Sequence, residues 1–181
     1  NIAWAKELMQ ALRALGISWN GAVSTLIVNH LDLLDDMRQA GCQSLFIGFE
    51  TVRQSSLLNV SKFQNRTEYY QRLVHEIHQR EIMINASFVF GFDHDTPDVF
   101  RSTLNWLVEN RIETFSGHIL TPYPGTKLYT RLQREERITR HDPELYNTAR
   151  VVFEPAQMSM DQLQQGYEWL LRKFYSLPCI I

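Results

Sequence analysis

The stretch Ile82–Gly91, IMINASFVFG, decides the fold class of this 181-residue chain. Its residues alternate in the way that a β-strand with one core-facing side requires. One face would carry Ile84, Ala86, Phe88 and Phe90, and the other Asn85, Ser87, Val89 and Gly91. Thr96 then predicts an N-cap and Pro97 a first helical position, so a helix follows the strand.

The sequence before this strand repeats the alternation of helix and strand. Apolar spacing predicts a helix over Trp4–Leu15, ended by Gly16, and then a strand over Ile17–Ser24. The elements expected next are a helix from an N-cap at Asn29 to Gly41, a strand over Leu45–Phe49, and a helix after a capping-box pair at Asn65 and Glu68.

The sequence after this strand continues the pattern and then loses it. The expected elements are a helix carrying Phe100, Leu104, Leu107 and Val108, a strand over Thr114–Thr121, a Pro-Tyr-Pro-Gly turn at 122–125, and a short charged helix through Arg137. Residues 140–158 read as irregular. Ser159 with Gln162 then predicts the cap of a last helix.

This order of elements predicts an α/β fold with two parts. Residues 1–137 would form a partial β/α barrel of the TIM type, with about four parallel strands and outer helices. Residues 138–181 would form a C-terminal extension with a terminal helix. Because the sequence opens on Asn1 within a helical pattern, we expect a segment of a longer protein whose missing N-terminal half supplies further strands. Self-association of the unclosed half-barrel is left open.

Composition excludes several classes of protein. The formal net charge of −2 provides no basic field for nucleic acid or an anionic membrane, and no apolar run is long enough to span a bilayer. Cys42 and Cys179 are too few for a disulfide framework or a cysteine-ligated cluster. We therefore expect a reduced, cytoplasmic protein.

Polar residues near the carboxyl ends of the strands are the first candidates for a site, because parallel β/α folds bind ligands there. Glu50 follows an apolar run; its carboxylate would accept hydrogen bonds from a ribose or an amino group, or would satisfy the start of the next helix. Asn85 and Ser87 indicate a solvated or ligand-filled interior, although an edge strand explains them equally well. His118 would bind a ligand, shuttle a proton, or be a satisfied core histidine.

Other motifs are less informative. Asp93-His94-Asp95 has the composition of a metal site, but adjacent residues on an extended loop do not converge on one ion without a special turn, so we predict no metal there. Gly48, Gly91 and Gly117 indicate close approach to the backbone in three strands. With no G-x-G-x-x-G, Walker loop or nucleophile elbow, no catalytic residue is assigned.

Three strand-end runs resemble radical S-adenosylmethionine enzymes. Ser44–Val52 (SLFIGFETV) is similar to their fourth strand, Ser87–Asp93 (SFVFGFD) to their fifth, which carries a glycine motif, and His118–Thr126 (HILTPYPGT) to their sixth. The last run, with the tail at 146–153 and 158–175, resembles the cobalamin-binding subgroup. That subgroup includes the oxidative cyclases of magnesium-protoporphyrin monomethyl ester and the hopanoid methylases.

The resemblance implies a set of binding residues. Those implied to contact S-adenosylmethionine are Glu50, Asn85, Ser87, Val89, Phe90, Gly91, Ile119 and Leu120. Of these, Glu50 would meet the ribose or amino group, Gly91 and its neighbours the adenine, and Ile119 and Leu120 the adenine edge through backbone groups. Those implied to approach the substrate are His118, Thr121 and Tyr123.

The resemblance also implies a mechanism for the parent protein. A reduced four-iron four-sulfur cluster would cleave S-adenosylmethionine, the resulting 5′-deoxyadenosyl radical would abstract hydrogen, and cobalamin would supply a methyl group or assist oxidation. The cysteine loop for the cluster and the cobalamin domain are not in these residues, so both cofactors would be bound elsewhere and the segment alone would be inactive. The substrate would be a tetrapyrrole, a lipid or a similar small molecule, methylated or oxidatively cyclised.

Two other interpretations remain open. The segment would be a non-catalytic half-barrel that binds a nucleotide or a protein partner, or an unrelated small α/β domain that matches by chance.

Overall fold

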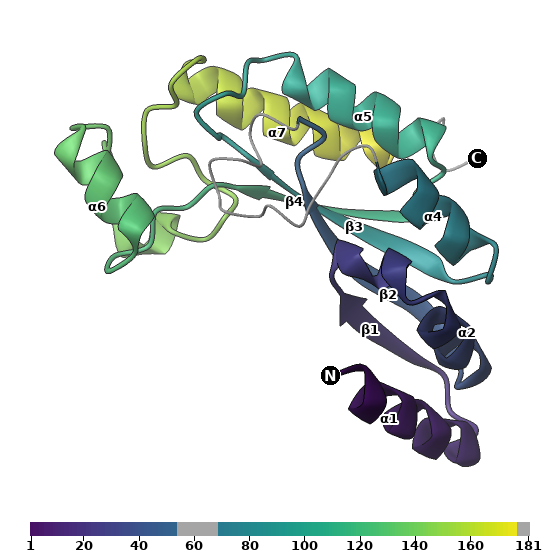
Figure 1. Cartoon of the computed structure of the whole chain (residues 1–181). Coiled ribbons are helices and arrows are strands. Elements are labelled where there is room, and N and C mark those ends of the chain that lie inside the picture. Colours follow the sequence, from purple (N-terminus) through teal and green to yellow (C-terminus); the bar gives the residue numbers. More distant parts are fainter. Residues whose placement is uncertain (54–68, 177–181) are drawn as a thin grey trace. The chain divides into compact units, whose positions relative to one another are not determined.

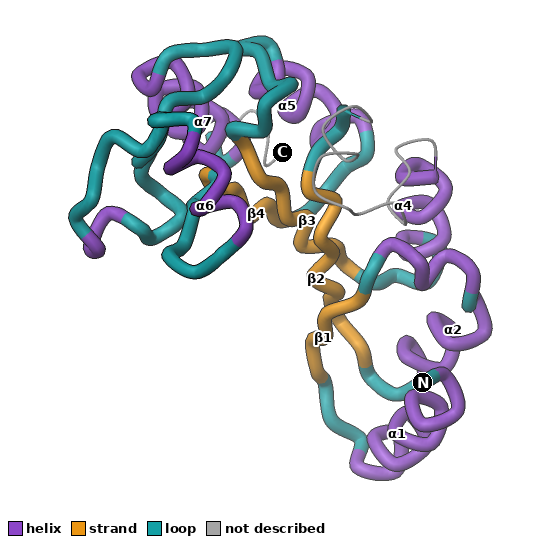
Figure 2. The backbone as a smooth tube through the Cα atoms, turned by 60° about the vertical axis from the view of Figure 1, so that its left-hand side comes forward, coloured by secondary structure: helices purple, strands orange, loops and turns teal. Residues whose placement is uncertain are grey.

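The computed structural model describes residues 1–53 and 69–176, and its strands form one open parallel sheet. The strands are β1 (Trp19–Val23), β2 (Cys42–Glu50), β3 (Met83–Phe90) and β4 (Thr114–Ile119), and they are neighbours in that order. β1 and β2 lie side by side (Figure 2) and pair in parallel, with Ala22 opposite Phe46. The predicted fold class is confirmed.

Helices separate the strands along the chain (Figure 1). The α-helices are α1 (Ile2–Leu15), α2 (Leu31–Gln39), α4 (Tyr70–His78), α5 (Val99–Glu109), α6 (Lys127–Arg134) and α7 (Met160–Phe174). Short 3-10 helices cover η1 (Thr25–Asn29) and η3 (Pro143–Leu145). No helix in the described part of the chain is long and apolar enough to cross a bilayer.

The chain divides into two compact units. Of the described residues, 1–49, 69–87 and 110–116 form the first unit; 50–53, 88–109 and 117–176 form the second. The core of the first unit contains four fully buried side chains: Leu34 of α2, Ile77 of α4, and Leu45 and Ile47 of β2. Burial of these side chains is the main stabilising contribution to this unit.

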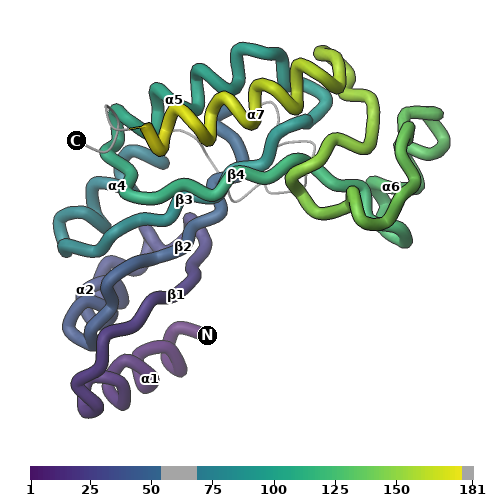
Figure 3. The backbone as a smooth tube through the Cα atoms, turned by 180° about the vertical axis from the view of Figure 1, so that it is seen from behind, coloured from purple at the N-terminus to yellow at the C-terminus, as the bar shows by residue number. Residues whose placement is uncertain are grey.

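In the second unit, α5 and α7 lie side by side in two opposite views (Figures 1 and 3). The aromatic rings of Phe90 and Phe100 pack at 5.2 Å between centroids, and those of Phe88 and Trp106 at 5.6 Å. Gly166 of α7 lies against the Phe100 ring, so close that a Cβ atom there would come within 2.1 Å of it. The two helices approach closely because this position has no side chain.

Some predicted helix boundaries agree with the structure and others do not. Gly16 caps α1 with φ 61°, and Ser159 and Gln162 form the capping box of α7. Asn29 is not an N-cap, because it ends η1 and α2 begins after His30. The pair Asn65 and Glu68 lies outside the described residues.

Thr96 is not the N-cap of α5 either. The helix begins at Val99, and the Thr96 hydroxyl donates instead to the carboxylate of Asp98. The prediction was wrong because Thr96-Pro97 forms a turn ahead of the helix, in which the Val99 N–H donates to the Thr96 carbonyl at 2.9 Å.

Candidate functional site

Glu50 ends β2 with a left-handed backbone, φ 71°, and its side chain is half-buried. A non-glycine residue pays conformational free energy for such a φ, and residues of this kind cluster at functional sites. Beyond it, Thr51 is buried and its Oγ1 accepts a hydrogen bond from the Arg53 N–H at 3.1 Å. Arg53 donates to the His94 carbonyl at 3.4 Å and forms an ion pair with Asp98. The exit of β2 is therefore fixed to the loop that follows β3.

The loop after β3 is built around Gly91, whose φ of 104° favours glycine. A Cβ atom here would lie 3.0 Å from Leu163 and 3.2 Å from Phe153, so the backbone is packed against the tail of the chain. The N–H groups of Gly91 and Phe92 both donate to Oδ2 of Asp95, at 2.9 and 3.0 Å, and Asp95 is fully buried. The buried carboxylate holds the loop in one conformation.

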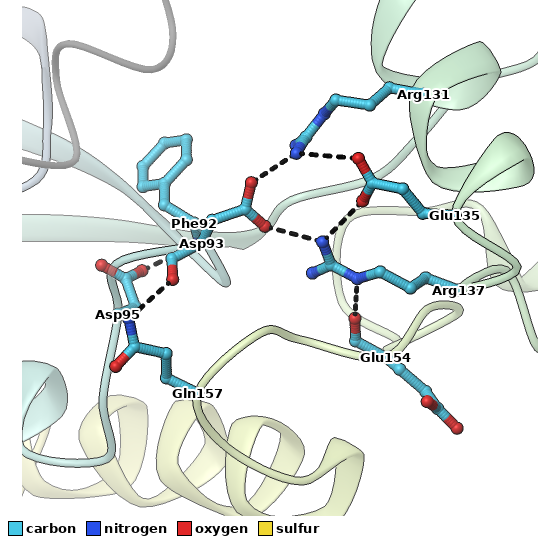
Figure 4. A network of polar contacts seen from close by, with 8 residues as sticks. All are labelled: Phe92, Asp93, Asp95, Arg131, Glu135, Arg137, Glu154 and Gln157. Carbon is cyan, nitrogen blue, oxygen red and sulfur yellow. Dashed lines mark hydrogen bonds and ion pairs between the residues drawn. The ribbon is translucent and has the colours of Figure 1, made fainter.

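Asp93, between those residues, is the centre of a polar network (Figure 4). Its carboxylate forms ion pairs with Arg131 and, at 2.9 Å, with Arg137, and Glu135 contacts both guanidinium groups. Gln157 donates to the Asp93 carbonyl at 3.1 Å. Burial opposes ionisation, but hydrogen bonds and charge from the two arginines outweigh it, so the pKa of the Asp93 carboxyl is lowered. The network ties the β3 exit to α6 and the tail.

These contacts define the chemistry available at Asp93-His94-Asp95. Asp93 is neutralised by guanidinium groups, His94 is exposed, and Asp95 accepts from backbone N–H groups. Across residues 1–53 and 69–176, no three His, Cys, Asp or Glu side chains gather as a metal site would require. The structure gives this motif an organising role.

Several backbone groups at the exit of β4 already form hydrogen bonds within the protein. The Ile119 N–H donates to the Thr148 carbonyl at 2.6 Å, and the Leu120 N–H donates to the Phe90 carbonyl at 2.8 Å. The hydroxyl of Thr121, which is buried, donates to the Ile119 carbonyl at 3.0 Å. Because both N–H groups are occupied, a ligand that contacts this backbone would have to meet its carbonyl oxygens.

Side chains of the same region differ in exposure. His118 is half-buried, and its Nδ1 lies 3.3 Å from Oγ1 of Thr148. Tyr123, in the exit turn, is 44% exposed. Tyr167 of α7 donates its hydroxyl to the Gly117 carbonyl at 3.3 Å, and burial raises the pKa of that phenol. The tail therefore contacts β4 through the side chains of Thr148 and Tyr167.

Three further predicted residues lie on β3. Asn85, in the first unit, is half-buried and its Oδ1 accepts from the hydroxyl of Ser116 at 3.0 Å. Ser87, also in the first unit, is buried, whereas Val89 in the second is half-buried. Asn85 and Val89 alternate with buried neighbours, as predicted for the polar face of the strand, whereas Ser87 is buried along with Ala86 and Phe88. The role of all three residues as cofactor contacts stays a prediction.

Several residues of this site could not be predicted from the sequence. Arg131 and Arg137 read only as part of a charged helix, and Thr148 lies in a stretch with no periodicity. Their partners, Asp93 and His118, are separated from them by 30 to 44 positions in the chain. Contacts at such distances cannot be read from local patterns.

The chain is similar in sequence to one family model and to several curated methyltransferases. Residues 126–178 match a family model described as "Domain of unknown function (DUF4070)". Bacteriochlorophyllide d C-12(1)-methyltransferase from Chlorobaculum tepidum is 30% identical over 97% of this chain, and the C-8(2)-methyltransferase of the same organism is 26% identical over 94%. The hopanoid C-2 methylase of Rhodopseudomonas palustris is 28% identical over 64%. The chain spans 38%, 40% and 22% of these relatives, respectively.

Two solved structures share the fold. Coproporphyrinogen III oxidase (HemN) from Escherichia coli, a radical SAM enzyme, superposes with a TM-score of 0.67 and 21% identity over 97% of this chain and 38% of its own. The radical S-adenosylmethionine methyltransferase TsrM from Kitasatospora setae, solved with cobalamin and a [4Fe-4S] cluster bound, gives 0.61 and 20% over 96% of this chain and 35% of its own. The resemblance that the strand-end motifs indicated is thereby confirmed, and the chain has the fold of the matching part of the barrel in these two solved structures.

Proposed function

We propose that this chain forms the S-adenosylmethionine-contacting part of a cobalamin-dependent radical methyltransferase. Methylation is favoured over oxidative cyclisation because the sequence relatives are named methyltransferases or methylases. A tetrapyrrole or a polycyclic lipid is the substrate class that those names suggest. The observation that carries the proposal is the pair of constrained backbones, Glu50 with φ 71° and Gly91 with φ 104°, at the ends of neighbouring strands.

The residues of the second unit fit such a cofactor. Glu50 offers a half-buried carboxylate that would accept hydrogen bonds from a ribose or an ammonium group. Gly91 lets the loop after β3 pack closely against Leu163 and Phe153, which fixes the backbone that would flank the adenine. At Ile119 and Leu120, where the N–H groups are engaged, the carbonyl oxygens would accept from an adenine amino group. S-adenosylmethionine, when bound, would supply one-electron radical chemistry at a carbon centre.

The cysteines of this chain do not fit an iron–sulfur cluster that is held by three cysteine ligands. It has two cysteines, and the thiol of Cys42 is buried with its pKa raised by desolvation to about 11. Cys179 lies outside the described residues. We therefore propose that the cluster and the cobalamin are held by other parts of the full-length protein.

The test compares two glutamates with the same backbone conformation. Glu50 and Glu136 both have positive φ, 71° and 55°, but Glu136 is exposed and lies away from the strand ends, after α6. Full-length protein carrying Glu50→Gln or Glu136→Gln would be purified without oxygen, reconstituted with iron and sulfide, reduced and assayed for 5′-deoxyadenosine. We expect Glu50→Gln to lower kcat/KM for S-adenosylmethionine about 10- to 100-fold, the range for a lost hydrogen bond to a charged group, and Glu136→Gln to change it less than about twofold.

Each outcome has a definite meaning. Equal kcat/KM values for the two variants would show that Glu50 does not contact S-adenosylmethionine. A full-length protein that binds no cluster would make a non-catalytic binding module the better account. A cyclised rather than methylated product would favour the oxidative reaction.

A further inference from the structure

Thr148 is a conformational outlier in the tail. Its φ of 62° lies in the left-handed region, where a β-branched residue is a genuine exception. Such a conformation costs free energy and persists only where the surrounding structure enforces it. Its position is therefore of interest for function.

The neighbours of Thr148 enforce its conformation. Its carbonyl accepts from Ile119 at 2.6 Å, which fixes it to β4. On the following side, Gln164 of α7 donates to the Ala149 carbonyl and accepts from the Val151 N–H, both at 3.1 Å. The backbone is held from the strand on one side and from the helix on the other, so the strained residue between them has a fixed place.

The side chain of Thr148 contacts His118. Oγ1 lies 3.3 Å from Nδ1 of the imidazole. No other residue in the described ranges forms a hydrogen bond or ion pair with His118, so Nε2 is the ring nitrogen left for a ligand. His118 occupies the same strand face as Ser116, whose hydroxyl donates to Asn85. This is the polar face of the sheet, opposite buried Phe115 and Ile119.

We propose that Thr148 is a positioning residue that holds the His118 imidazole by Nδ1, so that Nε2 forms a hydrogen bond with a polar group of the methyl-accepting substrate. The substrate role rests on the function proposed above; the coupling between the two side chains does not. The strained backbone brings the hydroxyl to the ring from the tail, a position that the sheet itself cannot supply. His118 is the group in contact with substrate, and Thr148 acts through it.

The test uses three variants of the full-length protein. Thr148→Val keeps the branched shape and the backbone strain but removes the hydroxyl, Thr148→Ser keeps the hydroxyl, and His118→Gln assigns the imidazole signals. The first readout is the ¹⁵N chemical shift of the two ring nitrogens of His118 in histidine-labelled protein. We expect Thr148→Val to shift the Nδ1 signal and change the tautomer ratio, and Thr148→Ser to restore both.

The second readout separates substrate turnover from cofactor cleavage. We expect Thr148→Val to lower kcat/KM for the methyl acceptor about five- to tenfold, the effect of one lost neutral hydrogen bond, with serine restoring it. Release of 5′-deoxyadenosine without acceptor should change less than about twofold. A purely structural role would affect both reactions together and would not be rescued by serine.

Two results would overturn the proposal: His118 nitrogen shifts in Thr148→Val identical to those of the unchanged protein, or serine and valine variants equally impaired in methyl-acceptor turnover. If the unchanged protein cleaves no S-adenosylmethionine, the proposed function fails, and the nitrogen shifts still decide whether Thr148 positions His118.

Discussion

The two edge strands of the sheet, β1 and β4, differ in how far other parts of the chain cover them. β1 is paired with β2 on one side, and no described strand pairs with its other side. Apolar side chains near it stay accessible: Trp4 of α1 is 61% exposed and Phe46 of β2 is 39% exposed. At β4, the tail supplies a backbone acceptor for Ile119 and buries Phe153 almost completely.

The difference shows where a single chain can complete its own fold. An edge strand presents unpaired N–H and C=O groups that have to be satisfied or covered. At β4 the polypeptide after α6 returns and provides this cover, through the Thr148 carbonyl that accepts from Ile119 and the Tyr167 hydroxyl that donates to Gly117. His118 and Thr148, to which we assign substrate binding and positioning, lie at the covered edge, where the tail fixes the surroundings of both side chains.

The largest expected effect comes from truncating one phenylalanine near each edge strand, Phe153 of the tail beside β4 and Phe46 of β2 beside β1. Phe153→Ala should lower the free energy of unfolding by about 3–5 kcal/mol. The ring is 1% exposed and packs against Gly91, so its removal leaves a cavity in the core. Phe46→Ala, at a side chain 39% exposed, should cost less than about 1 kcal/mol. Urea unfolding of the full-length protein measures both, and equal costs would remove the contrast between the edges.

A smaller effect is expected where the two covering helices meet. Gly166→Ala would place a Cβ atom 2.1 Å from the Phe100 ring. Overpacking of about 1–3 kcal/mol should outweigh the gain in helix propensity of about 1 kcal/mol, and the midpoint of thermal unfolding should fall. Gln165→Ala, at the exposed neighbouring position of α7, is the control and should leave the midpoint unchanged or slightly higher. A stabilised Gly166→Ala variant would show that α5 and α7 are not in close contact.

The smallest effect compares two carboxylates in ion pairs. Asp93→Asn should cost about 1 kcal/mol near neutral pH, after allowance for solvent screening, because the carboxylate faces two guanidinium groups. Asp32→Asn, which removes the fully exposed Lys6–Asp32 pair near the β1 edge, should produce no measurable change in the unfolding midpoint.

The pH dependence of the Asp93 effect has a definite sign. Its folded pKa lies below the ordinary value of 3.8, so the unfolded state binds a proton first as the pH falls. The stabilisation is fully present above that value and is lost as the pH falls through the folded pKa. Unfolding curves of Asp93→Asn and the unchanged protein should therefore converge below about pH 4; a gap that persists in acid would mean that the effect is not due to charge.

Much of the fold was predictable because its signals are local. The alternation in Ile82–Gly91 follows from the pleat of a strand, and the Ser159–Gln162 capping box lies within four residues. The prediction of an N-cap at Thr96 was wrong because a Thr-Pro pair is compatible both with a helix start and with the turn that precedes this helix. Glu50 was predictable as an acid at a strand end, but its left-handed backbone was not.

The sequence by itself determined the order of strands and helices, the two faces of β3 and the motifs at the strand ends, because each depends on neighbours within one or two turns of the chain. Only the tertiary structure decided which arginines pair with Asp93, that Asp95 holds the Gly91 loop, and that Thr148 reaches His118. Most of these partners lie 30 or more positions apart and are brought together by the return of the tail over β4. The strained φ of Thr148 exists only because that return fixes the backbone on both sides.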